Sequence, residues 1–71
     1  IKKNLSDDAV RLFRELVTKN PTNATYRYHL AMALFQKGDR PSAKQECQGA
    51  LKSNPSKEEQ LKIKELIAKL G

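Results

Sequence analysis

The sequence TNATYRYHLAMALFQKGDRPSAKQECQGALKSNPS, residues 22–56, predicts two helices joined by a tight turn. Apolar residues recur in it every three to four positions, as on one face of a helix. Gly38-Asp39 breaks the chain between the two segments, and Asn54-Pro55 ends the second one. Small residues on the apolar faces would let two antiparallel backbones approach closely; they are Ala31, Ala43 and Ala50. Gly49, inside the second segment, would allow a neighbouring helix to come close there as well.

The pattern recurs at a fixed interval, so that the chain holds two partial copies of one unit. In the first copy Ala9 and Phe13 repeat the spacing of Ala43 and Cys47. The other pairs that a shift of 34 brings together are Lys3 and Lys37, Val17 and Leu51, Asn20 and Asn54, Pro21 and Pro55, and Thr22 and Ser56. A fixed period of this length is typical of proteins built from stacked structural repeats.

Residues 22–55 resemble a tetratricopeptide repeat, a 34-residue helix–turn–helix. The Leu, Ala and Pro positions of that pattern are occupied here by Leu30, Ala31, Ala43 and Pro55. Three positions depart from it: Arg27 stands for Trp, Leu34 for Tyr and Cys47 for Phe. The resemblance implies an all-α fold of antiparallel helical hairpins, an α-solenoid of about four helices.

We therefore interpret residues 1–71 as a single domain with three parts. Residues 1–21 would be the second helix of a truncated repeat, residues 22–55 one complete repeat, and residues 56–71 a capping helix that closes the array. The expected helices run from about Asp7 to Lys19, Ala24 to Lys37, the turn around Pro41 to about Ser53, and Lys57 to Lys69. On this interpretation the chain is the C-terminal piece of a longer array.

Local signals mark the expected helix ends. Ser6 would cap the first helix, with Asp7 and Asp8 at the positive end of its dipole. Asn23 or Thr22 would cap the second helix, and Gly38 would end it. Ser56-x-x-Glu59 is a capping box for the last helix. In that helix, we expect these charged residues to make the outer face polar: Glu58, Glu59, Lys62, Lys64, Glu65 and Lys69.

The composition narrows the possible partners. The net charge of +6 raises the possibility of nucleic-acid binding, but the fourteen Lys and Arg residues are scattered and Lys2-Lys3 is their only adjacent pair. Solvated helix faces explain them better. No run of residues is long and apolar enough to predict membrane insertion. With one cysteine there can be no intrachain disulfide, and Cys47 is interpreted as a small buried hydrophobe rather than a reactive thiol.

Nothing in the sequence predicts catalysis. It has no Gly-rich phosphate loop, no cluster of Cys or His with metal-ligand spacing, and no nucleophile elbow. His29 is the single histidine, and no residue near it in sequence would make a catalytic or metal-binding set. We predict a non-enzyme with no cofactor, no metal and no small-molecule substrate.

The resemblance implies a protein or peptide ligand held on the concave face, which the first helix of each repeat lines. The residues that it assigns to this face are Thr25, Tyr28, His29, Met32, Phe35 and Gln36. The alternative is internal packing, in which Met32 and Phe35 contact the last helix. The clamp for a peptide C-terminal carboxylate found in some family members is not predicted in this repeat, because Tyr28 and Met32 stand where it needs Lys and Asn.

A structural role is the remaining alternative: the segment would terminate an array or self-associate. A homodimer is expected if the apolar face of the first helix is left bare by its missing upstream partner. The sequence leaves open the identity of the partner, the parent protein, the number of upstream repeats and the compartment, whether cytoplasm or periplasm.

Overall fold

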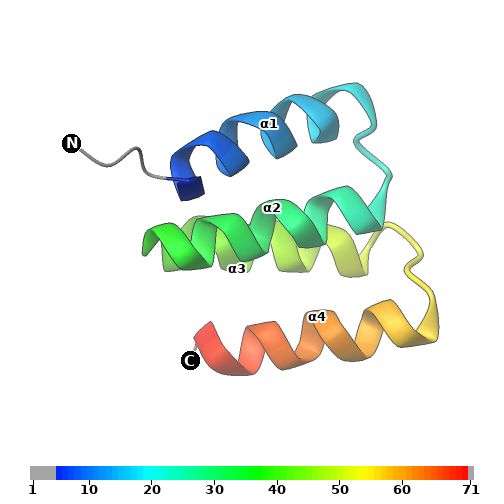
Figure 1. Ribbon diagram of the computed structural model, residues 1–71. Coiled ribbons are helices and arrows are strands. Elements are labelled where there is room, and N and C mark those ends of the chain that lie inside the picture. The colour runs from blue at the N-terminus through cyan, green and yellow to red at the C-terminus, as the bar shows by residue number, and fades with distance from the viewer. Residues whose placement is uncertain (1–4, 71) are drawn as a thin grey trace.

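The computed structural model describes residues 5–70, and over this range the chain forms four helices joined by short turns (Figure 1). They are α1 (Leu5–Lys19), α2 (Ala24–Lys37), α3 (Arg40–Leu51) and α4 (Lys57–Leu70). Successive helices run antiparallel, so α2 and α4 point in the same direction (Figure 1). No residue in this range lies in a strand. The predicted all-α fold of helical hairpins is confirmed.

Helix α2 begins and ends at the predicted residues, with Asn23 as its N-cap and Gly38 as its C-cap. At its start, Asn23 Oδ1 accepts a hydrogen bond from the Tyr26 backbone N–H at 3.0 Å. This bond satisfies one of the amides that has no partner within the helix. At its end Gly38 adopts the left-handed conformation with φ of 97°, which a residue without Cβ adopts freely. Its N–H then reaches the Phe35 carbonyl at 3.0 Å.

The starts of α3 and α4 are also held by side chains. Asp39 accepts a hydrogen bond from the Ser42 N–H at 3.3 Å, and Pro41 lies in the first turn, where it needs no donor. The predicted capping box of α4 is present. The Glu59 N–H donates to Ser56 Oγ at 3.1 Å, and the Ser56 N–H donates to Glu59 Oε1 at 3.2 Å.

Two helix ends differ slightly from the predicted ones. The first helix already includes Leu5, the first described residue, so Ser6 lies inside it, and the predicted capping by the Ser6 side chain falls outside what the structure describes. The third helix ends at Leu51 rather than near Ser53. Asn54 has φ of 53°, a left-handed conformation that belongs to a turn.

The interior consists of two apolar clusters on either side of the central hairpin formed by α2 and α3. Cluster 1 joins α1 to this hairpin and cluster 2 joins α4 to it. The buried members of cluster 1 are Val10, Val17, Leu30, Ala33, Leu34 and Ala43. The buried members of cluster 2 are Ala31, Cys47, Ala50, Ile63 and Leu66. Half-buried Phe35 and Leu70 pack against both clusters, which makes them the side chains that connect the two halves of the core.

Some positions one repeat length apart make corresponding contacts in the stack. The rings of Phe13 and His29 stack across α1 and α2 with centroids 5.3 Å apart. The repeat shift places Phe13 on Cys47 and His29 on Ile63, and those two residues belong together to cluster 2. Ala9 and Ala43 differ from this pattern, because both pack in cluster 1 rather than in successive clusters; Ala43 is fully buried and Ala9 partly buried.

Arg27, which stands at the tryptophan position of the repeat pattern, connects three parts of the chain. Its Nε donates to the Pro21 carbonyl at 2.7 Å, and its Nη1 lies 3.1 Å from Glu46 Oε1 on α3. The side chain of Arg27 lies over Gly49, where an added Cβ would be 3.0 Å from Nη1. The nearest atoms over Gly49 thus belong to a long polar side chain of α2, and not to the closely approaching helix that the sequence predicts there.

In the described part of the chain, every helix is too short or too polar to traverse a lipid bilayer.

Candidate functional site

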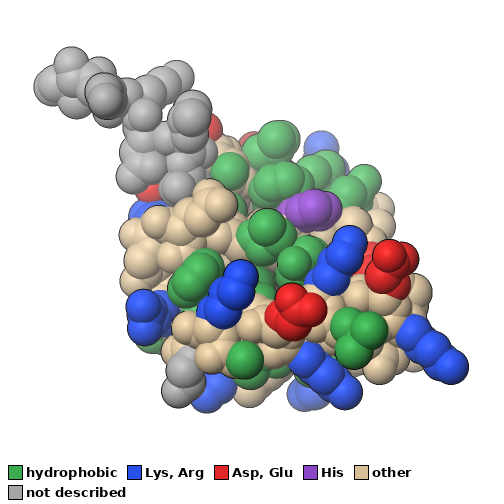
Figure 2. Space-filling view, turned by 60° about the horizontal axis from the view of Figure 1, so that its bottom comes forward, with side chains coloured by type: hydrophobic (Ala, Val, Ile, Leu, Met, Phe, Trp, Pro, Cys, Tyr) green, Lys and Arg blue, Asp and Glu red, His purple; other side chains and the backbone are tan. Residues whose placement is uncertain are grey.

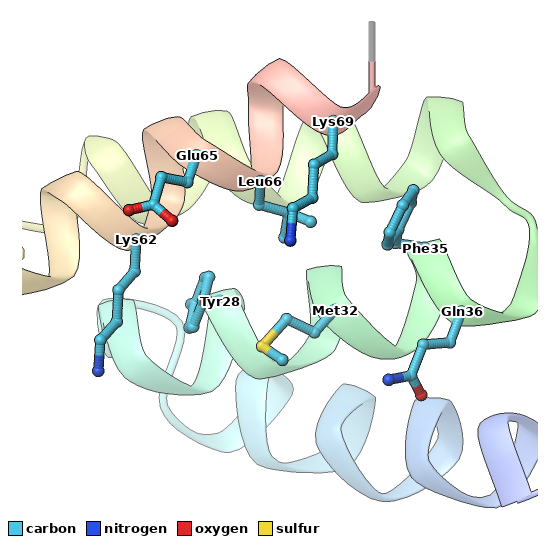
Figure 3. A pocket seen from close by; sticks show the side chains of 8 residues that line it. All are labelled: Tyr28, Met32, Phe35, Gln36, Lys62, Glu65, Leu66 and Lys69. Carbon is cyan, nitrogen blue, oxygen red and sulfur yellow. The ribbon is translucent and has the colours of Figure 1, made fainter.

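A pocket of about 190 Å³ lies between α2 and α4 (Figure 3). The small-molecule sites of proteins usually measure roughly 300–1,000 Å³, so this pocket suits a single side chain of a partner better than a whole cofactor. Four residues of α2 line it: Tyr28, Met32, Phe35 and Gln36. Four residues of α4 line the opposite side: Lys62, Glu65, Leu66 and Lys69.

The two sides of the pocket are the same face of the repeat used twice. The repeat shift places Tyr28 on Lys62, Met32 on Leu66 and Phe35 on Lys69. One turn before the pocket, the Thr25 hydroxyl donates a hydrogen bond to Glu59 Oε2, which is again a pair of equivalent positions. The pocket is therefore a groove between two helices whose lining positions lie 34 residues apart.

The pocket has an apolar base. Leu66 is buried, and Tyr28, Met32 and Phe35 are half-buried against cluster 2. These side chains pack on α4 and also leave part of their surface in the groove. The sequence leaves packing and groove lining as alternatives for Tyr28, Met32 and Phe35. In the structure these side chains do both: they pack against cluster 2 and they line the groove.

Charged groups surround this apolar base. The side chains of Lys62, Glu65 and Lys69 are exposed. Figure 3 shows Lys69 reaching from α4 toward α2, whereas the side chain of Glu65 points away from Lys69. Burial raises the pKa of the Tyr28 phenol above its usual value of 10.0, and the negative charge of Glu65 raises it further. At neutral pH Tyr28 therefore keeps its phenol proton, and it can form a hydrogen bond at the end of the pocket that it shares with Glu65.

The residues that the sequence assigned to the groove do not all lie in the pocket. Tyr28, Met32, Phe35 and Gln36 line it. Thr25 lies beyond its end and is bonded to Glu59. His29 faces the other way, because its ring stacks on Phe13 of α1.

Sequence reasoning missed the half of the pocket that α4 supplies. It assigned Lys62, Glu65 and Lys69 to an outer polar face; all three are exposed, and the structure adds that they line the groove with α2. The repeat shift would have found them. It carries Tyr28 and Phe35 directly onto Lys62 and Lys69.

Other features of the described residues are weaker candidates. A surface depression of about 300 Å³ on α1 is lined by side chains of that helix alone, so no second element fixes its shape. Burial raises the pKa of the Cys47 thiol to about 11, with a smaller contribution from Glu46, and a protonated buried thiol is a poor nucleophile. Within residues 5–70, no three His, Cys, Asp or Glu side chains are grouped so that they could hold a metal ion.

A stack of antiparallel helical hairpins whose equivalent positions recur at a fixed interval defines a class of protein, the helical-repeat solenoids. Within this class, the family model described as Tetratricopeptide repeat matches residues 4–70. The chain belongs to the tetratricopeptide repeat family. No solved structure matches it significantly. Members of this family commonly mediate protein–protein interaction and are typically non-catalytic.

Proposed function

We propose that this chain is a non-catalytic module that binds a peptide segment of a partner protein in the groove between α2 and α4. The observation that carries the proposal is the pocket itself, because equivalent faces of two repeat units enclose it and leave three half-buried side chains open to a ligand. Tyr28, Met32 and Phe35 would supply apolar contact, and Gln36 would supply a hydrogen bond. Thr25 and His29 would lie outside the central contact.

The division into repeats belongs to this proposal. Residues 1–21 would provide the second helix of one repeat, residues 22–55 a complete repeat, and residues 56–71 the first-helix equivalent that ends the stack. Lys64 and Glu65 of α4 stand where α2 carries the buried Leu30 and Ala31, and both are exposed. A polar surface there suits a helix that closes an array toward water.

Selection from a random peptide display library, followed by NMR titration of the chosen peptides into labelled protein, tests the binding function. We expect backbone shifts concentrated in residues 28–36 and 62–69. Met32→Ala should weaken binding severalfold, because the methionine side chain lines the pocket. Leu12→Ala is the matched control, since it removes apolar surface of similar size from the exposed face of α1. Shifts confined to α1, or equal effects of the two substitutions, would contradict the groove assignment.

Self-association is a second candidate that one observation favours. Leu12 is 55% exposed on α1, and its neighbours Phe13 and Leu16 are only half-buried. The α3 equivalents of these two neighbours, Cys47 and Ala50, are fully buried. A second copy packed on this face would bury the same positions on α1. Sedimentation at rising protein concentration tests this, and a monomer at every concentration would contradict it.

A further inference from the structure

From the charges around the pocket we propose that the peptide carries an acidic side chain directly beside the apolar side chain that enters the groove, with its carboxylate placed against Lys69. This inference rests on the proposed function and adds the chemistry of the partner. It depends on three observations: the apolar base, the unequal distribution of charge along the pocket, and a lysine that has no ion-pair partner among the described residues.

Phe35 and Lys69 form one end of the pocket, where the charge is positive. Lys69 is exposed, lines the pocket and reaches from α4 toward the α2 side (Figure 3). The ion pairs between described side chains join Arg27 to Glu46 and Lys37 to Asp7, and neither involves Lys69. Over residues 5–70 no carboxylate forms an ion pair with this ammonium group, and the side chain of Glu65, one turn earlier on α4, points away from it (Figure 3).

Tyr28, Lys62 and Glu65 form the opposite end of the pocket. Here the charges are mixed, because the Glu65 carboxylate acts on Tyr28 and Lys62 interacts with Glu59. A ligand carboxylate would gain little at this end, since it would meet Glu65 as well as Lys62. The preference for an acidic group is thus local, and it is strongest beside Lys69.

The surface around the pocket is mainly basic. The chain has a net charge of +6, and Figure 2 shows basic side chains spread around the hydrophobic ones on the face toward α4. A positive field of this kind accelerates the encounter with an acidic segment. The apolar base then selects among acidic segments, because binding there requires an apolar side chain to be buried against Met32 and Leu66.

Three end-blocked heptapeptides test the inference. Each has a central phenylalanine, and the two residues on either side of it are glutamates in the first peptide, glutamines in the second and lysines in the third. Titrated into the labelled 71-residue chain at physiological salt, the glutamate peptide should shift residues 28–36 and 62–69 and bind at least about fivefold more tightly than the glutamine peptide. The lysine peptide should bind more weakly than either.

Three variants locate the effect. Lys69→Gln should weaken the glutamate peptide about two- to fivefold, the usual effect of losing one exposed ion pair, and should leave the glutamine peptide unchanged. Glu65→Gln should strengthen the glutamate peptide by a smaller factor. Lys44→Gln is the matched control, because it removes the same charge from an exposed position on α3 outside the pocket and should have less effect than Lys69→Gln.

The outcomes separate this inference from the function on which it rests. Equal binding of the glutamate and glutamine peptides in the groove would overturn the acidic preference and leave groove binding intact. Equal effects of Lys69→Gln and Lys44→Gln would overturn the assignment to Lys69. If none of the three peptides shifts the groove residues, both proposals fail. Displacement of the glutamate peptide by an oligothymidylate at equal concentration would overturn the acidic-peptide assignment, because it would show that the lysines select polyanions.

Discussion

Replacing Gly49 with alanine should have opposite consequences for the helix and for its surroundings. Alanine is favoured over glycine inside a helix by about 1 kcal/mol. At this position, however, the new Cβ would lie 3.0 Å from Arg27 Nη1 and 3.4 Å from its Cδ and Cζ. The arginine must therefore move by a few tenths of an ångström, and it is held at both ends of its guanidinium.

The free-energy cost of moving Arg27 can be estimated from the contacts that hold its side chain. The Arg27–Glu46 pair has an N–O distance of 3.1 Å with both side chains about one-quarter exposed, and the second contact is the 2.7 Å hydrogen bond to Pro21. A partly exposed ion pair contributes about 0.5–1 kcal/mol and a hydrogen bond about 1 kcal/mol. Weakening these contacts offsets most of the gain in helix propensity, so Gly49→Ala should change the free energy of unfolding by less than about 0.5 kcal/mol.

A double-mutant cycle with Arg27→Met checks this reasoning. Methionine removes the guanidinium and its fixed contacts, so Gly49→Ala in that background should stabilise the protein by close to the full ~1 kcal/mol of helix propensity. Urea unfolding followed by circular dichroism measures all four proteins. If Gly49→Ala is stabilising to the same full extent in both backgrounds, Arg27 does not constrain this position and the argument is refuted.

Three further predictions concern the core and the titrating groups. Ile63→Ala should lower the free energy of unfolding by about 2–5 kcal/mol, because Ile63 is fully buried. Leu61→Ala, at a position 64% exposed on the same helix, should change the free energy of unfolding by less than ~0.5 kcal/mol. Denaturant titration of the two variants decides whether α4 is packed as described. The Thr25 hydroxyl and the capping box lower the pKa of Glu59, so its contribution to stability is present above its ordinary pKa of 4.5 and is lost as the pH falls through its folded-state pKa. The difference in thermal stability between wild type and Glu59→Gln should be largest at pH 7 and should shrink as the pH is lowered below 4.5, and a constant difference would contradict this. The Cys47 thiol, with its pKa raised to about 11, should react with iodoacetamide at pH 8 only slowly until urea unfolds the chain, and rapid labelling of the native protein would contradict its burial.

The helix starts and ends that the sequence predicts well are those fixed by a single residue with one dominant conformation or contact. Gly38 and Asn23 each act through their own backbone or side chain, and both behave as expected. Ser6 lies inside α1 rather than directly before it, because helix ends follow weak local preferences and shift easily by one or two residues. The repeat period of 34 residues also predicted which helix faces correspond to one another along the chain.

The site was predictable only in part, since each side of the pocket has a different sequence. The α2 side carries apolar and aromatic residues that indicate a contact surface. The α4 side carries Lys62, Glu65 and Lys69, which resemble any solvated helix face until the neighbouring helix is placed. Likewise, the link between Arg27 and Glu46 joins residues that no short-range pattern pairs. Such contacts depend on the packing of whole helices, so spacing along the chain does not predict them.

Separate clusters in the interior give the fold a seam beside the pocket. Cluster 2 holds α4 to the central hairpin, while cluster 1 involves mainly the other three helices. Detachment of α4 would remove one whole wall of the groove and leave most of cluster 1 in place. A bound peptide that touches both walls must therefore oppose this local opening, and amide hydrogen exchange in residues 57–70 should slow in proportion to occupancy. Ligand affinity and the persistence of the last helix would then be two measures of one equilibrium.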